Sequence, residues 1–260
     1  MSLFETEILY GVVAFLRIGG MLFALPIFGD TPTPVRTRIL LAVGLTAATM
    51  PLVPEGWYQP FPDTIETSLL LVCKELFIGI SIGFIARLSF DAIMLAASIV
   101  GYQMGFGTAN LMLADQYQQV NSFEAFHKMI TMLIFLMLDL HVFFIKVIAD
   151  SFNLIPMGLA GLSADIYTFL LTLSSAFFVT GIKLAAPVLV SLMFTMAALG
   201  LVARAVPQMN IFTMSFPTSF FIGLVVYVAT IPFFPEWYKS YFETMYTNLN
   251  QFVSGIGAGT

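Results

Sequence analysis

Charged side chains are scarce in this sequence. They make up 10% of its 260 residues, whereas a soluble globular domain carries about 25%. Hydrophobic residues account for 59% of the chain, and the mean hydropathy is +0.94. Because one soluble core cannot bury this much apolar surface, the shortage of charge excludes an ordinary soluble domain and indicates a membrane protein.

Cysteine and histidine are nearly absent as well. Cys73 is the single cysteine, so no disulfide can form within the chain. Neither His127 nor His141 has a metal-ligating neighbour at helical spacing. The sequence also lacks the H-E-x-x-H, G-x-S-x-G and G-x-x-x-x-G-K-[ST] motifs. We therefore expect no metal, no cofactor and no enzymatic activity.

Basic patches and linkers are missing too. The net charge is -5, and no stripe of basic residues interleaved with aromatic residues occurs, so we do not expect binding to nucleic acid. No polar or low-complexity stretch divides the chain, which predicts a single unit over residues 1–260. Because no positive charge precedes Arg17, we expect the first apolar stretch to be retained rather than removed as a signal peptide.

Long apolar runs are what the sequence has in abundance. A helix crosses the bilayer with about 20 residues. Runs of that order lie near 8–29, 68–90, 92–114, 129–149, 166–203 and 211–235, and a shorter one covers 39–53. They predict an all-α membrane protein with long helices, most of which are interrupted by glycine, proline or charge.

Ionisable residues inside these runs need partners. On insertion scales, an arginine at mid-span, such as Arg17, raises the free energy of membrane insertion by about 2.5–3.5 kcal/mol. Each Leu, Ile, Phe or Val lowers it by about 0.3–0.6 kcal/mol. The first run can therefore still insert, with Arg17 facing a partner or a cavity. Asp139 and Lys146 are too far apart along a helix to pair, so each needs another helix or subunit. For Asp139 and His141, contacts between helices are favoured over a proton relay, because the two side chains point in different directions.

The segment 101–121 combines three glycines with a run of uncharged polar residues. Gly101 and Gly105 have the spacing of a close contact between membrane helices. The alternative is a loop beside an aqueous path, which is favoured because lipid could hardly satisfy so many amides. The amides are those of Gln103, Asn110, Gln116, Gln118, Gln119 and Asn121.

A second polar cluster, RAVPQMNIF at 204–212, separates two strongly apolar stretches. Pro207 breaks a helix, while Arg204, Gln208 and Asn210 offer donors with no acid nearby to pair them. Irregular backbone at membrane depth persists only where it is buried in protein or lines a wet cavity. We therefore expect a turn between two long helices, held by a neighbouring subunit.

These features occur within ordered blocks that resemble the FliR family of flagellar biosynthetic proteins, which includes the SctT proteins of injection systems. The strongest block is ALGLVARAVPQMNIF at 198–212. The others are Pro26 and Pro34 before Arg36 and Arg38, GFGTANLM at 105–112, DLH at 139–141, SFNLIPMG at 151–158 and KLAAPVL at 183–189, which contains Pro187. The resemblance covers nearly the whole chain.

The resemblance implies a core subunit of the flagellar type III export gate, located in the bacterial inner membrane at the flagellar basal body. Such a subunit assembles with FliP, FliQ and FlhB, contacts lipid and passes unfolded flagellar proteins. It implies a fusion of a FliP-like part, about 1–165, and a FliQ-like part, about 166–260, with broken helices and helical hairpins packed in a helical hetero-oligomeric ring.

The resemblance also assigns candidate residues. A plug loop in the closed gate falls on Gly105, Phe106, Gly107, Asn110, Leu111, Met112, Gln116, Gln118, Gln119 and Asn121. Subunit contacts or helix turns fall on Arg17, Arg36, Arg38, Asp139, His141, Pro187, Arg204, Pro207, Gln208 and Asn210. Two alternatives stay open at this point: the equivalent subunit of an injectisome, and a small-solute secondary transporter with broken helices at mid-depth. An intramembrane enzyme is disfavoured because no nucleophile has a positioned base.

Overall fold

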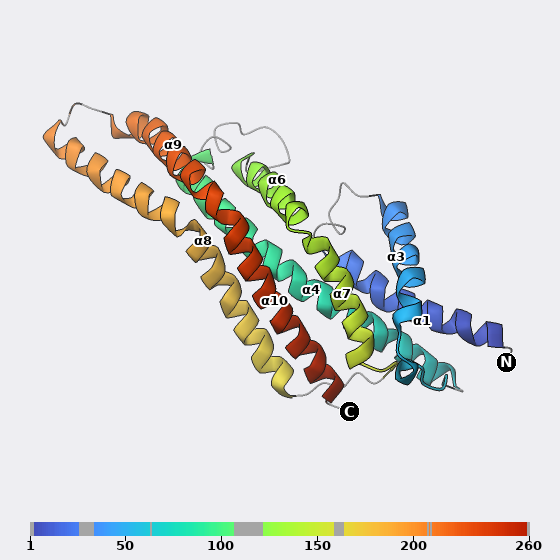
Figure 1. The fold of residues 1–260 in the computed structure, drawn as a ribbon. Coiled ribbons are helices and arrows are strands. Elements are labelled where there is room, and N and C mark those ends of the chain that lie inside the picture. Colours follow the sequence, from blue (N-terminus) through green and yellow to red (C-terminus); the bar gives the residue numbers. More distant parts are fainter. Residues whose placement is uncertain are drawn as a thin grey trace. The chain divides into compact units, whose positions relative to one another are not determined.

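The computed structural model describes residues 3–25, 34–62, 64–106, 122–158, 164–206, 208 and 210–258, and within them every regular element is helical (Figure 1). The α-helices are α1 (Leu3–Ala24), α3 (Val35–Thr49), α4 (Ile65–Gln103), α6 (Ser122–Met137), α7 (Leu140–Leu154), α8 (Ala164–Ala205), α9 (Ile211–Thr230) and α10 (Phe234–Ala258). Short 3-10 turns occupy Met50–Leu52, Glu55–Trp57 and Ile231–Phe233.

Several helices exceed what a bilayer requires. At 1.5 Å per residue, α4 with 39 residues and α8 with 42 residues would each reach about 60 Å, whereas the hydrocarbon core is about 30 Å thick. In the described part of the chain, length and composition qualify four segments as membrane spans, or five if the pair α6 and α7 counts as one. The four are Val35–Leu52, Ile65–Gln103, Leu171–Ala205 and Thr213–Gly255. The expected class, an all-α membrane protein, is confirmed.

Several helix boundaries differ from the apolar runs. The runs 68–90 and 92–114 belong to one uninterrupted helix as far as Gln103, because Arg87 and Asp91 interrupt hydropathy without breaking the backbone. The run 129–149 is divided at Asp139, whose φ of 51° lies in the left-handed region. Helix α10 continues to Ala258, well past the last apolar run, because it buries only one face.

The chain forms two compact units, each assembled from separated stretches. The first contains Met1–Phe90, Leu140–Ser174 and Phe242–Thr260, and the second contains Asp91–Asp139 and Ser175–Tyr241. Helices α4, α8 and α10 contribute residues to both units. The division into a FliP-like part and a FliQ-like part at about residue 165 remains a prediction.

Glycines bring α1 and α4 together in the first unit. A Cβ atom on Gly79 would overlap the backbone carbonyl of Arg17, and one on Gly83 would lie 2.6 Å from the carbonyl oxygen of Met21. On the opposing helix, a Cβ on Gly20 would lie 3.1 Å from the carbonyl oxygen of Leu76. The sequence Gly79-x-x-x-Gly83 thus supplies the small-residue contact of membrane helices. At the other spacing, Gly101 is buried within α4, and Gly105 follows the end of the helix with φ +93°; a helix contact through this pair remains a prediction.

Candidate functional site

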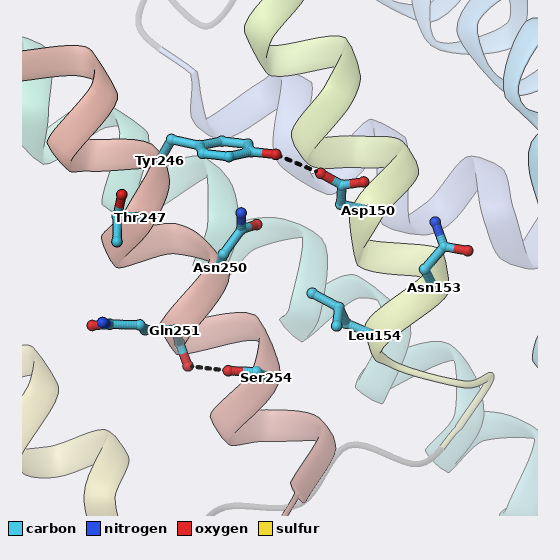
Figure 2. A pocket seen from close by; sticks show the side chains of 8 residues that line it. All are labelled: Asp150, Asn153, Leu154, Tyr246, Thr247, Asn250, Gln251 and Ser254. Atoms are coloured by element: carbon cyan, nitrogen blue, oxygen red, sulfur yellow. Dashed lines mark hydrogen bonds between the residues drawn. The ribbon is translucent and has the colours of Figure 1, made fainter.

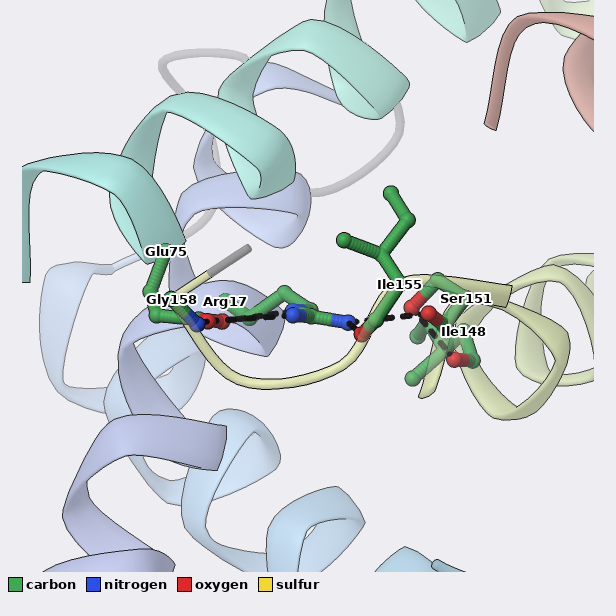
Figure 3. Close-up of polar contacts among 6 residues, drawn as sticks. All are labelled: Arg17, Glu75, Ile148, Ser151, Ile155 and Gly158. Atoms are coloured by element: carbon green, nitrogen blue, oxygen red, sulfur yellow. Dashed lines mark hydrogen bonds and ion pairs between the residues drawn. The ribbon is translucent and has the colours of Figure 1, made fainter. Parts of the chain in front are cut away.

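A buried ion pair lies within the first unit (Figure 3). Arg17 of α1 is 2% exposed and Glu75 of α4 is 0% exposed. The guanidinium donates from Nε to Glu75 Oε2 over 2.6 Å and from Nη2 to Oε1 over 3.1 Å, a bidentate arrangement. Its Nη1 donates to the carbonyl oxygens of Ser151 and Ile155, over 2.9 and 3.1 Å, at the end of α7. One side chain therefore fastens α1 to both α4 and α7.

The segment that follows α7 completes this polar cluster. The backbone N–H of Gly158 donates to Glu75 Oε1 over 2.9 Å, and Lys74 Nζ donates to the Gly158 carbonyl over 2.9 Å. Gly158 has a φ of +73°, which a glycine adopts without strain. The guanidinium carbon lies 4.9 Å from the ring centre of Phe152 and 5.8 Å from that of Trp57. We call Arg17, Glu75 and Gly158, with their hydrogen-bond partners, the Arg17 cluster.

The Arg17 cluster joins elements rather than catalysing a reaction. Its carboxylate and guanidinium are occupied by each other and by backbone groups, so neither is placed to attack or protonate a substrate. Sequence reasoning predicted that Arg17 would face a partner or a cavity, and it did not identify Glu75. The signal was available: an acid at mid-span in a second apolar run is the natural counter-charge for an arginine at mid-span in the first.

A second buried polar group, not predicted from the sequence, lies in the second unit. His127 of α6 has a hydroxyl at each ring nitrogen: Tyr227 of α9 at 2.7 Å from Nδ1 and Tyr238 of α10 at 3.2 Å from Nε2. The Tyr238 hydroxyl also lies 3.1 Å from Thr131 Oγ1. These contacts hold α6 to both helices that flank the 3-10 turn Ile231–Phe233. Among the described residues no cluster of metal-ligating side chains accompanies His127.

The predicted plug loop is only partly described. Gly105 and Phe106 belong to the second unit, where the Phe106 ring lies 5.8 Å from that of Phe123 and 5.6 Å from that of Phe220. A Cβ on Gly105 would lie 2.5 Å from the Phe216 ring, so the residue must stay small. The other plug candidates lie outside the described residues: Gly107, Asn110, Leu111, Met112, Gln116, Gln118, Gln119 and Asn121.

The predicted contact residues of the first half are not gathered in one place. Arg36 is exposed, and the guanidinium of Arg38 lies 5.8 Å from the ring centre of Phe23. Asp139 is exposed at the junction of α6 and α7, and the side chain of His141 lies outside the described part of the chain. Lys146, for which a partner on another helix was expected, lies 5.3 Å from the ring centre of Tyr246 on α10.

The predicted contact residues of the second half lie in or after α8. Pro187 is exposed inside α8, which continues through it. Arg204 occupies the last turn of α8 and is exposed, as are Gln208 and Asn210 in the connection to α9. Pro207 lies outside the described residues. The connection between α8 and α9 therefore presents an arginine and two amides at the surface of this chain.

Together these helices and buried contacts define an all-helical membrane protein. Within its described residues, the buried charges of Arg17 and Glu75 pair with each other. Comparison with known proteins then gives the family. Residues 8–245 match the family described as Bacterial export proteins, family 1, and the chain belongs to it. This is the family of FliR, a non-enzymatic component of the bacterial flagellar export apparatus, and the membrane-length helices agree with a place in the inner membrane at the flagellar basal body.

Individual relatives support the same assignment. The flagellar biosynthetic protein FliR of Escherichia coli strain K12 is 27% identical over 241 residues, which cover 93% of this chain and 91% of the relative. FliR of Caulobacter vibrioides is 30% identical over 227 residues, covering 86% and 90%. FliR of Bacillus subtilis strain 168 is 29% identical over 226 residues, covering 85% and 86%. The similarity thus extends over nearly the full length on both sides.

Proposed function

We propose that this protein is a core subunit of the flagellar type III export gate, and that it helps to form the channel through which unfolded flagellar proteins leave the cytoplasm. Membership in the family supports the export context. The alternatives of an injectisome subunit and a solute transporter gain no support from the relatives described above, which are named as flagellar proteins.

The apolar surface of the long helices carries this proposal. In the most apolar 18-residue stretch of Leu171–Ala205, only 22% of the chain is buried. In the corresponding stretch of Thr213–Gly255, only 17% is buried. Large side chains such as Phe194, Phe221 and Val225 are more than 60% exposed. Because these helices are much longer than a bilayer is thick, lipid cannot cover their whole apolar length. Neighbouring protein subunits would cover the remainder.

We further propose that the covering subunits are FliP-, FliQ- and FlhB-type proteins, arranged with this chain in a helical hetero-oligomeric ring. In this arrangement residues 1–165 take a FliP-like place and residues 166–260 a FliQ-like place. The exposed Arg204, Gln208 and Asn210 then lie at a subunit contact. The donors of Arg204 and Gln208 would find acceptors on the neighbour, which is how polar groups near lipid are usually satisfied.

Copurification tests this assembly. When the chain is co-expressed with FliP- and FliQ-type proteins from its own host, we expect one stable complex in detergent. Arg204→Glu should lower the yield of that complex several-fold, because it places a carboxylate where a cationic donor is needed. Lys239→Glu, a charge reversal at another exposed position, should leave the yield unchanged. A wild-type chain that purifies alone and never with these partners would refute the proposal.

The segment 105–121 is proposed to close the channel as a plug. Its start is held by Phe106 against Phe123 and Phe220, which supports a fixed anchor at this end of the segment. Deleting Thr108 to Gln116 should leave the complex assembled but let small solutes leak through the inner membrane. Growth on a normally impermeant toxic solute measures the leak. An equally tight membrane with the deleted chain assembled would contradict the plug.

A further inference from the structure

An open groove separates α7 from α10 within the first unit (Figure 2). Its volume is about 510 Å³, within the range of 300–1,000 Å³ that is common for ligand sites. Except for Leu154, every lining side chain carries a polar group. The lining residues are Asp150, Asn153, Leu154, Tyr246, Thr247, Asn250, Gln251 and Ser254.

This polar lining is unusual for so apolar a chain. On α10 the lining residues Thr247, Asn250, Gln251 and Ser254 follow helical spacing, so they share one face. The other face of α10 is buried, with Leu249, Phe252 and Val253 all under 5% exposed. Because hydrocarbon cannot satisfy such a stripe, the groove faces water or a polar partner.

One amide in the groove is free to bind a partner. The hydroxyls of Thr247 and Ser254 donate to carbonyls of their own helix, over 3.2 and 2.9 Å. Asn153 donates in the same way to the Ala149 carbonyl over 3.3 Å. Within the described part of the chain, no hydrogen bond occupies the side-chain amide of Asn250. In Figure 2 this amide points into the space between the helices, whereas the Gln251 side chain extends away from α7.

Charge around the groove is close to balanced. The Asp150 carboxylate accepts a hydrogen bond of 2.9 Å from the Tyr246 hydroxyl, and Lys146 Nζ lies 5.3 Å from the centre of the same ring. A lipid phosphate would meet a carboxylate in the groove, which disfavours it. A neutral partner that offers both N–H and C=O groups suits the lining better, because a side-chain amide both donates and accepts.

We propose that the groove between α7 and α10 binds an extended segment of an unfolded polypeptide, whose main-chain N–H and C=O groups pair with the amide of Asn250. An extended chain leaves its peptide groups unpaired, whereas a helix has already used them. Recognition of the main chain does not depend on the side chains of the bound segment. One groove could therefore bind export substrates of different sequence. The inference rests on the proposed export function, because that function supplies the unfolded polypeptide.

Cross-linking in living cells tests this binding. A photoreactive amino acid is placed at Gln251, or at Glu243 as an exposed control on α10 outside the groove. The cells carry an export substrate fused to a domain that does not unfold, so that the substrate stalls in the channel. We expect the substrate to cross-link at position 251 and not at 243. Cross-linking at 251 only to another export-gate subunit, or to nothing, overturns the proposal.

A variant separates this groove from the export function itself. Asn250→Leu should reduce secretion about fivefold, the order expected for the loss of one net hydrogen bond, with the amount of assembled complex unchanged. Glu243→Gln should secrete at the wild-type rate. If wild-type protein restores secretion to a host strain lacking it and the Asn250→Leu variant secretes equally well, the groove inference alone fails. If the wild-type protein restores no secretion, both proposals fail.

Discussion

Replacing Arg17 by methionine is expected to destabilise the protein by about 3–5 kcal/mol, the usual effect of removing one partner from a buried ion pair. The Glu75 carboxylate would stay buried, with the Gly158 N–H as its remaining donor in the described part of the chain. The carbonyls of Ser151 and Ile155 would lose the guanidinium as well. Thermal unfolding of the full-length chain in detergent, with its abundance in membranes, measures the effect.

Two further variants test whether the broken ion pair causes this loss of stability. Arg36→Met removes an exposed arginine and should change stability by less than about 0.5 kcal/mol. Arg17→Met combined with Glu75→Leu removes both charges and should recover much of the stability, because apolar groups of similar volume can replace a buried ion pair. If Arg17→Met unfolded at the wild-type temperature, the fastening role of the Arg17 cluster would have to be abandoned.

The second large effect is expected at the contact between α1 and α4. Gly79→Ala places a methyl group on the backbone carbonyl of Arg17, so the two helices must separate. Overpacking of this kind costs about 1–3 kcal/mol, and here it would also pull Arg17 away from Glu75. We expect lower thermal stability and less chain in the membrane, measured as for Arg17→Met.

A matched glycine on α1 serves as the control. A Cβ atom on Gly19 would have no neighbouring atom within 4 Å among the described residues, so Gly19→Ala meets no obstacle there. Alanine is favoured over glycine inside a helix by about 0.5–1 kcal/mol, so this variant should be as stable as wild type or slightly more stable. Equal effects of the two substitutions would argue against a close contact at Gly79.

The sequence predicted the class of fold well because hydropathy reports directly on it. A run of apolar residues long enough to cross a bilayer has few alternatives to a helix. The ends of helices were harder to predict. The gap between the runs 68–90 and 92–114 suggested a boundary at Asp91, although an aspartate is compatible with the interior of α4. Conversely, nothing in the local sequence of Asp139 required the left-handed backbone that divides α6 from α7.

Buried polar pairs were the hardest feature to predict. The energetic argument showed that Arg17 needed a partner or a cavity, but the choice of Glu75, 58 positions away, depends on the packing of α1 on α4, which hydropathy does not contain. The bonds from His127 to Tyr227 and Tyr238 span 100 and 111 positions and were not predicted for the same reason. Of the residues assigned by resemblance, Arg204 lies in the last turn of α8 and Phe106 follows the end of α4, while their roles in the gate remain predictions.

The separation between Arg17 and Glu75 has a consequence for synthesis of the chain. Arg17 is made 58 residues before Glu75, an interval of about 3–12 s at 5–20 residues per second. The carbonyls of Ser151 and Ile155 follow 134 and 138 residues after the arginine. Until α4 arrives, the first helix must keep its arginine near water or bonded elsewhere. The partner that neutralises Arg17 therefore belongs to a helix that the ribosome has not yet made when α1 emerges.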